Sequence, residues 1–384
     1  MNMISCQKDK FSLPEDVSYL NGAYMSPQLK SVERVGIEAL RKKNQPYRIT
    51  TEDFFEHRRS LKEKYARLIS LDDPEQIAII PSASYGLANA ARNISLKPGQ
   101  EILMVAEQFP SNVYSWKRLA EEKGGILRTV SPPDTFEGRG EKWNEELLRQ
   151  ITEKTAVVAL PHVHWADGTL FQLKAIREKT REVGALMIID GTQSVGALPF
   201  SVKELDPDAL ICAGYKWLLG PYSLGLAYYG AHFKDGIPME ENWINRRYSE
   251  NFKGLTEYQE AFQPGAERYS VGESSNFNHV PMLLNAIEQL LEWTPEAIQT
   301  YCAEISADAV HKLRALDYFI EEDSYRAHHL FGIYIRHGHD LTAIKKRMEK
   351  QKVYVSYRGE AIRVSAHLYN TALDFRKLTQ CFGG

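Results

Sequence analysis

Two short apolar runs, each followed closely by polar side chains, limit what this chain can fold into more than any other feature. The first, residues 186–189, ends in Asp190 and is followed by Gln193; the second, residues 209–212, leads to Lys216. Runs of this length and composition are typical of buried parallel strands. Because ligands bind at the carboxyl ends of the strands in an open α/β sheet, we expect these polar groups to face a small molecule.

Lys216 has apolar and aromatic neighbours: Tyr215 precedes it, and Trp217, Leu218 and Leu219 follow. A lysine partly removed from water has a less favoured ammonium form, and its neutral amine can form a Schiff base with a carbonyl cofactor whose pyridinium nitrogen an acid holds. Two simpler interpretations stay open. An Asp-Gly pair after a strand is also a common turn or metal site, and a lysine beside tryptophan can extend its amine to solvent.

The order of the expected elements predicts an α/β fold for most of the chain. Strand-like runs alternate with helical patterns across residues 77–230, which predicts a mostly parallel sheet with helices on both faces. The expected strands lie at residues 77–80, 101–106, 156–160, 186–189 and 209–212, and the helical patterns at residues 32–42, 54–69, 87–92 and 170–182.

A second, smaller α+β unit is expected near the C-terminus. Two long helical patterns, at residues 281–293 and 295–316, lead into it. Its expected elements are strands at 330–336, 353–357 and 361–365 with a helix at 341–351. We therefore divide the chain into an N-terminal segment (1–20), which can pack with the small domain, a large domain (21–280) and a small C-terminal domain (281–384).

An anion site is expected where the strand at residues 77–80 runs through Pro81, Ser82, Ala83 and Ser84 into the helix at 87–92. The free N–H groups of a helix's first turn, a serine hydroxyl and the helix dipole all favour a phosphate there. A plain N-cap serine is the alternative.

Aromatic side chains follow two of the other strands. Phe109 follows the strand at 101–106 and can cover the face of a pyridine ring, while Trp165 follows the strand at 156–160 and can line a pocket with its indole N–H free for a polar partner.

A metal site is a possible reading of His162, His164 and Asp167. All three occupy one strand-end loop without a further His or Cys at ligand spacing, so we predict no metal.

Composition excludes some classes of function. The formal charge of -3 lacks the basic excess of a nucleic-acid binder, and no apolar run approaches the roughly 20 residues of a membrane span. The four cysteines, Cys6, Cys212, Cys302 and Cys381, show neither CxxC spacing nor disulfide density, which predicts reduced thiols and a cytoplasmic protein.

The order Asp190, Gln193 and then Lys216 after a second strand resembles the fold type I pyridoxal-phosphate enzymes. Within them it resembles the class V aminotransferase group, which includes cysteine desulfurases, kynureninase and isopenicillin N epimerase. The resemblance covers nearly the whole chain and implies a large domain with a seven-stranded type of sheet. It also implies that pyridoxal 5'-phosphate is the cofactor, with Asp190 at the pyridine nitrogen, Gln193 at the phenolic oxygen and Lys216 in the Schiff base.

The same resemblance implies further cofactor contacts. Relatives carry a small residue and Thr or Ser for the cofactor phosphate where this chain has Ala83 and Ser84. Tyr215 stands where relatives have a phosphate-binding histidine, and Phe109 where desulfurases have a histidine. Since phenylalanine cannot move protons, a histidine-dependent relay is not expected. Trp165 stands where desulfurases have an asparagine.

For the substrate, the resemblance implies that Arg363 binds the α-carboxylate and that the loop holding Asn21 covers the substrate. A structural salt bridge at Arg363 and a tight turn at Asn21 are the alternatives. Residues 268–276 resemble the loop that reaches the partner's phosphate site in homodimeric relatives, although this chain has Gly-Glu where relatives usually have Gly-Thr.

These features predict an enzyme that acts on an amino acid through a Cα carbanion, with an aminotransferase as first choice and a C-S lyase or epimerase as alternative. A cysteine desulfurase is disfavoured, because its nucleophilic loop thiol has no counterpart between Asp317 and Arg363. A catalytically silent binding protein is the remote alternative.

Overall fold

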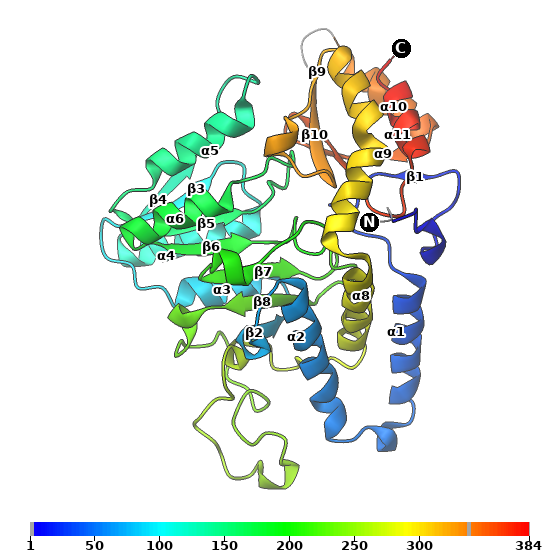
Figure 1. Ribbon diagram of the computed structural model, residues 1–384. Coiled ribbons are helices and arrows are strands. Elements are labelled where there is room, and N and C mark those ends of the chain that lie inside the picture. The colour runs from blue at the N-terminus through cyan, green and yellow to red at the C-terminus, as the bar shows by residue number, and fades with distance from the viewer. Residues whose placement is uncertain (1–3, 336–338, 384) are drawn as a thin grey trace.

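The large sheet dominates the computed structural model, which describes residues 4–335 and 339–383 (Figure 1). Its seven strands follow the order β2-β8-β7-β6-β5-β3-β4. They are β2 (Ile77–Ile80), β3 (Glu101–Val105), β4 (Ile126–Val130), β5 (Thr155–Pro161), β6 (Leu186–Asp190), β7 (Ala209–Ala213) and β8 (Gly225–Tyr229). Strand β8 runs antiparallel to its neighbours β7 and β2, and the pairs from β7 to β4 are parallel. The mostly parallel sheet is thereby confirmed.

Helices cover both faces of this sheet. Ile188 of β6 belongs to the core beneath α3 (Ala83–Arg92) and α4 (Tyr114–Lys123), while the next residue, Ile189, belongs to a separate core. Among the helices that contribute to that second core are α1 (Lys30–Lys43), α2 (Glu56–Leu68), α5 (Arg139–Gln150), α6 (Leu173–Val183), α7 (Val202–Leu205) and α8 (His279–Trp293), together with the C-terminal helices. Because side chains alternate along a strand, a strand that is apolar throughout is buried on both faces.

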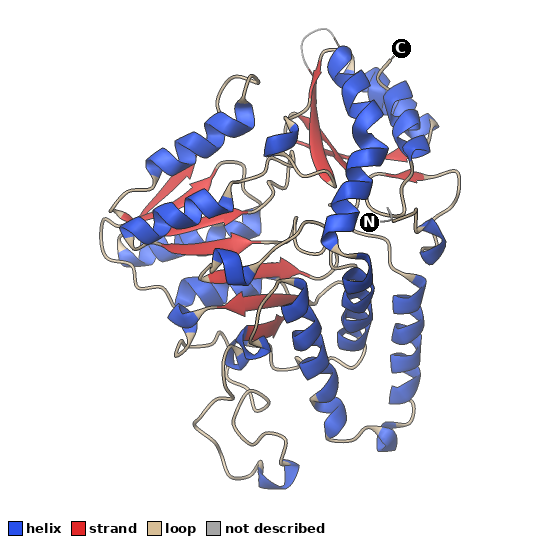
Figure 2. Cartoon of the chain, viewed as in Figure 1, coloured by secondary structure: helices blue, strands red, loops and turns tan. Residues whose placement is uncertain are grey.

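A smaller antiparallel sheet lies near the C-terminus, in the order β12-β13-β10-β9 (Figure 2). Its strands are β9 (Tyr318–Phe319), β10 (Leu330–Ile335), β12 (Ser356–Arg358) and β13 (Ala361–Ser365), and α9 (Pro295–Ala315), α10 (Leu341–Lys350) and α11 (Ala372–Gln380) accompany it. Residue 336 of the strand expected at 330–336 lies outside the described residues. Helix α8 lies on the small-domain side of the limit expected at residue 280, yet it packs against α1 and α2 of the large domain. The domain limits at residues 20 and 280 therefore stay a prediction.

Two expected boundaries were wrong. The single strand expected at 353–357 is two strands, because β11 (Val353–Tyr354) pairs with β1 (Ser18–Tyr19) of the N-terminal segment while β12 pairs with β13. The helix expected at 87–92 begins at Ala83, because Ser82 rather than Ser84 caps it.

Within the described residues no helix combines the length and the apolarity needed to cross a membrane.

Candidate active site

A cavity of about 250 Å³ opens at the carboxyl ends of β5, β6 and β7, beside the first turn of α3. All eight residues that the sequence predicts to bind the cofactor line this one cavity. They are Ala83, Ser84, Phe109, Trp165, Asp190, Gln193, Tyr215 and Lys216. The strand ends meet here because parallel strands present their carboxyl ends at the same edge of a sheet.

Asp190 is the last residue of β6 and is only 8% exposed. One carboxylate oxygen, Oδ1, accepts the backbone N–H of Thr192 at 3.0 Å. Burial raises the pKa of Asp190, and the hydrogen bonds from Thr192 and the charge of Lys216 partly oppose that rise. A cation placed in the cavity would therefore stabilise the ionised carboxylate.

Lys216 follows β7 in a turn and is 6% exposed. Its Nζ lies 5.4 Å from the centre of the Phe109 ring and makes no hydrogen bond or ion pair with any residue that the structure describes. Burial lowers the pKa of Lys216 to about 8; the charge of Arg363 lowers it too, and Asp190 raises it. An appreciable fraction of this amine is therefore neutral near neutral pH.

The side-chain amide of Gln193 is held from two sides. Nε2 donates to the carbonyl oxygen of Ala23 at 3.1 Å, and Oε1 accepts the indole N–H of Trp217 at 2.9 Å. The second hydrogen of Nε2 remains available in the cavity that Gln193 lines.

Two serines begin α3 at the cavity wall. Ser82 accepts the backbone N–H of Tyr85 at 3.2 Å, and its hydroxyl lies 2.8 Å from that of Ser84. Ser82 also lines the cavity, although the sequence reasoning assigned it no role. An N-cap side chain accepts the backbone N–H two or three residues further along the chain, and this spacing could have identified Ser82 from the sequence. Free N–H groups of the helix's first turn and two hydroxyls form an anion-binding end.

Phe109 and Trp165 form one wall of the cavity. Their rings meet edge to face with centres 5.4 Å apart, and the indole N–H of Trp165 donates to the carbonyl oxygen of Glu107 at 2.6 Å. This hydrogen bond and the ring contact fix the orientation of the indole.

A second cavity of about 320 Å³ adjoins the first and shares Lys216, Phe109 and Trp165 with it. Arg363 enters it from β13 and is 1% exposed. Its Nη1 donates to the carbonyl oxygen of Trp165 at 2.7 Å and Nη2 to the hydroxyl of Ser356 at 3.4 Å, while Nε is buried without a partner.

The charge of Arg363 has no counterion in the described part of the chain. No carboxylate in residues 4–335 and 339–383 forms an ion pair with it, and burial lowers its pKa to about 9. The structural salt bridge that the sequence left open at Arg363 is thus absent from the described part of the chain.

Asn21 lines neither of these two cavities; the neighbouring residues Ala23, Tyr24 and Met25 line the second. Its Oδ1 accepts the hydroxyl of Ser356 at 2.7 Å, and Ser356 in turn binds Arg363. Asn21 is therefore linked to the Arg363 side chain through the hydroxyl of Ser356. A direct contact between Asn21 and the substrate remains a prediction.

The residues considered as metal ligands make other contacts. His164 Nδ1 lies 3.0 Å from Oδ1 of Asp167. The other carboxylate oxygen of Asp167, Oδ2, pairs with Arg139 at 3.0 Å and accepts the hydroxyl of Tyr334 at 2.7 Å. The ring of His162 packs against Phe200 instead. Among the described residues no group of three or more His, Cys, Asp and Glu is arranged to hold a metal ion.

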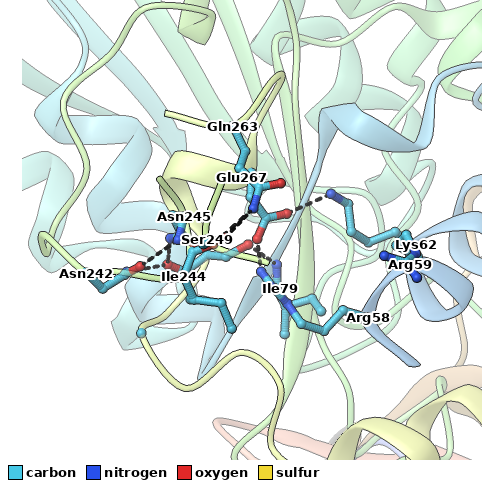
Figure 3. A network of polar contacts seen from close by, with 12 residues as sticks. Arg58, Arg59, Lys62, Ile79, Asn242, Ile244, Asn245, Ser249, Gln263 and Glu267 are labelled. Carbon is cyan, nitrogen blue, oxygen red and sulfur yellow. Dashed lines mark hydrogen bonds and ion pairs between the residues drawn. The ribbon is translucent and has the colours of Figure 1, made fainter. Parts of the chain in front are cut away.

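Residues 268–276 lie along the outer edge of the sheet, beside β2. Glu267, just before them, forms ion pairs with Arg58 and Lys62 of α2 (Figure 3). The backbone N–H of Ile79 donates to the hydroxyl of Ser270 at 3.0 Å. This segment lines neither cavity of its own chain.

A sequence profile described as Aminotransferase class-V matches residues 47–378, most of the chain. The chain belongs to the class-V aminotransferase family. It is therefore a pyridoxal-phosphate-dependent enzyme of the transferase class with the fold type I architecture.

Its relatives carry several activities. The chain is 26% identical to the uncharacterized aminotransferase YcbU of Bacillus subtilis (strain 168), over 82% of this chain and 80% of that one. It is 32% identical to a probable cysteine desulfurase of Halalkalibacterium halodurans, over 47% of this chain and 44% of that one.

Among solved structures, a lysine mutant of C-DES with glycine covalently linked to its PLP cofactor matches with a TM-score of 0.84 at 18% identity, covering 97% of this chain and 98% of that one. Another structure calls C-DES a cystine C-S lyase. This likeness bears on the fold alone.

The cavity residues fit pyridoxal phosphate. The cavity holds the buried carboxylate of Asp190, an amine at Lys216 without a hydrogen bond to the described residues, and an anion-binding end at the start of α3. These are the groups that a pyridine nitrogen, an aldehyde and a phosphate require.

Proposed function

We propose that this enzyme is an aminotransferase that acts on a substrate with both an amino group and an α-carboxylate. One observation carries the proposal: Arg363, a buried guanidinium without a carboxylate partner among the described residues, faces the same cavity as the unpartnered amine of Lys216. A planar guanidinium binds a carboxylate through two parallel hydrogen bonds.

The proposed roles follow from where the side chains lie. Pyridoxal phosphate, when bound, supplies an electron sink for negative charge at the substrate's Cα. We assign Lys216 to hold the cofactor and to move the proton at Cα, Asp190 to keep the ring nitrogen protonated, and Gln193 to donate to the phenolic oxygen. Arg363 would clamp the carboxylate from the small domain, so that the Cα proton points toward Lys216.

The test is a half-reaction of the holoenzyme with single amino acids and no 2-oxo acid. A transaminase should convert its cofactor to pyridoxamine phosphate and release one equivalent of 2-oxo acid. A C-S lyase or an epimerase, the alternatives within the family, should keep the cofactor in its pyridoxal form. The first would release a β-group and ammonia, and the second would exchange the Cα proton with solvent deuterium. Either outcome would refute the aminotransferase assignment.

The desulfurase activity of several relatives is not proposed for this chain. Such an enzyme needs a thiol at the substrate, and Cys212, Cys302 and Cys381 are buried and outside both cavities, as is the half-buried Cys6.

Replacing Tyr215 with phenylalanine should weaken cofactor retention by about one to two orders of magnitude, the scale of one hydrogen bond to a charged group. Tyr215 lines the cofactor cavity, and its hydroxyl has no partner among the described residues, which leaves it free for the phosphate. Equilibrium dialysis of pyridoxal phosphate would measure the change. Tyr114→Phe, at an exposed tyrosine of α4 that lines neither cavity, is the control for removing one phenolic hydroxyl. An unchanged affinity in Tyr215→Phe would mean that the ring only packs.

We also propose a homodimer in which residues 268–276 reach the partner's cofactor phosphate. The segment is held at the sheet edge, and the hydroxyl of Ser274 is buried without a partner. Lys216→Ala chains mixed with Ser274→Ala/Ser275→Ala chains should regain activity that neither variant has alone, because one hybrid site keeps both intact parts. Failure of the mixture to regain activity would place the segment in its own chain's site or in none.

A cytoplasmic location is proposed from the four cysteines, all free thiols in the structure. Cell fractionation would test it, and recovery outside the cytoplasm would contradict it.

A further inference from the structure

A second arginine, Arg358, faces the cavity that holds Arg363. Its Nη1 donates to the neighbouring carbonyl oxygen of Tyr357 at 2.8 Å, and its Nε is buried without a hydrogen-bond partner. Within residues 4–335 and 339–383 no ion pair joins Arg358 to a carboxylate. The proposed α-carboxylate contact uses only one of the two guanidinium groups.

Strand pairing places both arginines on one face of a hairpin. In the β12–β13 pair Ser356 stands opposite Arg363, and Arg358 lies two residues beyond Ser356. Since side chains alternate along a strand, Arg358 and Arg363 are diagonal neighbours that point to the same side. Both guanidinium carbons lie near the Trp165 ring, 5.6 Å and 6.0 Å from its centre, so the indole holds both groups at the cavity.

The wall of this cavity is cationic, and no acidic side chain among the described residues lines it. Lys216, Arg358 and Arg363 line it, and its other lining residues are apolar or aromatic. Arg358 and Arg363 both lower the pKa of Lys216, so the three groups act on one another. Lys216 and Arg363 are buried and Arg358 is partly buried. Like charges brought together away from water are costly, and a ligand with anionic groups relieves that cost.

One carboxylate near the hairpin does not fill this role. Glu107 lies close to the turn of the hairpin, because a Cβ atom added to Gly359 would be 3.9 Å from its Oε2. Even so, Glu107 forms no ion pair with Arg358 in the described part of the chain. Its charge acts instead on Arg139 and Tyr334, outside the cavity wall.

We propose that the substrate is an amino acid with an anionic side chain, whose α-carboxylate binds Arg363 and whose side-chain carboxylate binds Arg358. This rests on the proposed function, which assigns Arg363 to the α-carboxylate. At about 320 Å³ the cavity is at the small end for ligand sites, which favours a compact dicarboxylic amino acid over a long or branched one. Arg358 is then the residue that selects substrates.

The test compares pairs of ligands that differ in one charge. With the holoenzyme, kcat/KM is measured for L-aspartate against L-asparagine and for L-glutamate against L-glutamine. The dissociation constants of succinate and succinamate, which carry no amino group to transfer, are measured by calorimetry. The wild-type protein should prefer the acidic member of at least one amino-acid pair and should bind succinate more tightly than succinamate.

Arg358→Gln should lower kcat/KM for the acidic amino acid and weaken succinate binding by about 10- to 100-fold each, the scale of one charge-assisted contact. The values for the amide ligands should change little. Arg358→Lys, which keeps the charge and loses the fork, should recover part of the loss. Arg376→Gln, an exposed arginine on α11 of the same domain, is the control for removing one positive charge.

The outcomes separate this inference from the function it rests on. Equal losses for the acidic and amide ligands in Arg358→Gln, or a wild-type preference for the amides, would overturn the role of Arg358 while transamination stands. If the wild-type protein transaminates no amino acid, the proposed function fails, and the succinate measurement still decides whether Arg358 selects a second carboxylate.

Discussion

Lys216→Ala should lower kcat for the best amino-acid substrate by about four orders of magnitude, the upper range for a group that moves a proton in the rate-limiting step. The physical reason is that, among the residues the structure describes, no other lysine amine lines either cavity. Borohydride reduction of the wild-type holoenzyme should attach the cofactor to the peptide that contains Tyr215 and Lys216, and the variant should take up no such label. Peptide mapping by mass spectrometry and steady-state kinetics measure the two effects.

Lys123→Ala is the control for Lys216, because Lys123 ends α4 on the exposed surface. It should keep both the label at Lys216 and full activity. A label on another lysine in the wild-type enzyme, or near-normal turnover by Lys216→Ala, would remove Lys216 from the proposed mechanism.

Arg363→Lys should lower kcat/KM for an amino-acid substrate by about two orders of magnitude or more. Lysine keeps the positive charge but loses the planar fork that holds the carboxylate, and with it the orientation of the Cα proton. Because Arg363 lies on the small domain while the predicted cofactor contacts line the first cavity, the absorbance of the bound cofactor should barely change. Steady-state kinetics with a titration of cofactor absorbance would measure both.

The matched control is Arg347→Lys. Arg347, in α10, also donates to a backbone carbonyl oxygen, that of Cys381, at 2.6 Å, and it lines neither cavity. It should leave kcat/KM unchanged. Intact turnover in Arg363→Lys together with a lower melting temperature would make Arg363 a structural residue and would remove the main support for an α-carboxylate substrate.

Local pattern was enough to find the large sheet and the residues at its edge. Residues 186–189 and 209–212 are apolar throughout, and a strand buried on both faces needs that composition wherever the rest of the chain lies. Asp190 and Lys216 follow from these runs because the carboxyl ends of parallel strands share one edge. Strands β4 and β8 and helices α4 and α5 were not predicted. Of these, β4 is an edge strand with exposed and polar positions that blur its pattern.

Features that depend on distant partners could not be derived in the same way. Residues 353–357 have the composition of one strand, but whether they form one or two depends on β1, more than 300 residues earlier in the chain. The first residue of α3 depended on which of two serines turns its hydroxyl toward a backbone N–H.

The amino-acid pattern alone predicted the architecture and the cluster of polar groups at one sheet edge, because these follow from periodicity and strand direction. The cofactor was implied by the resemblance to a known family. Only the tertiary structure decided that Arg363 has no carboxylate partner among the described residues and that Arg358 stands beside it over Trp165. Whether a buried charge is paired depends on every segment that folds around it, and no local pattern encodes that.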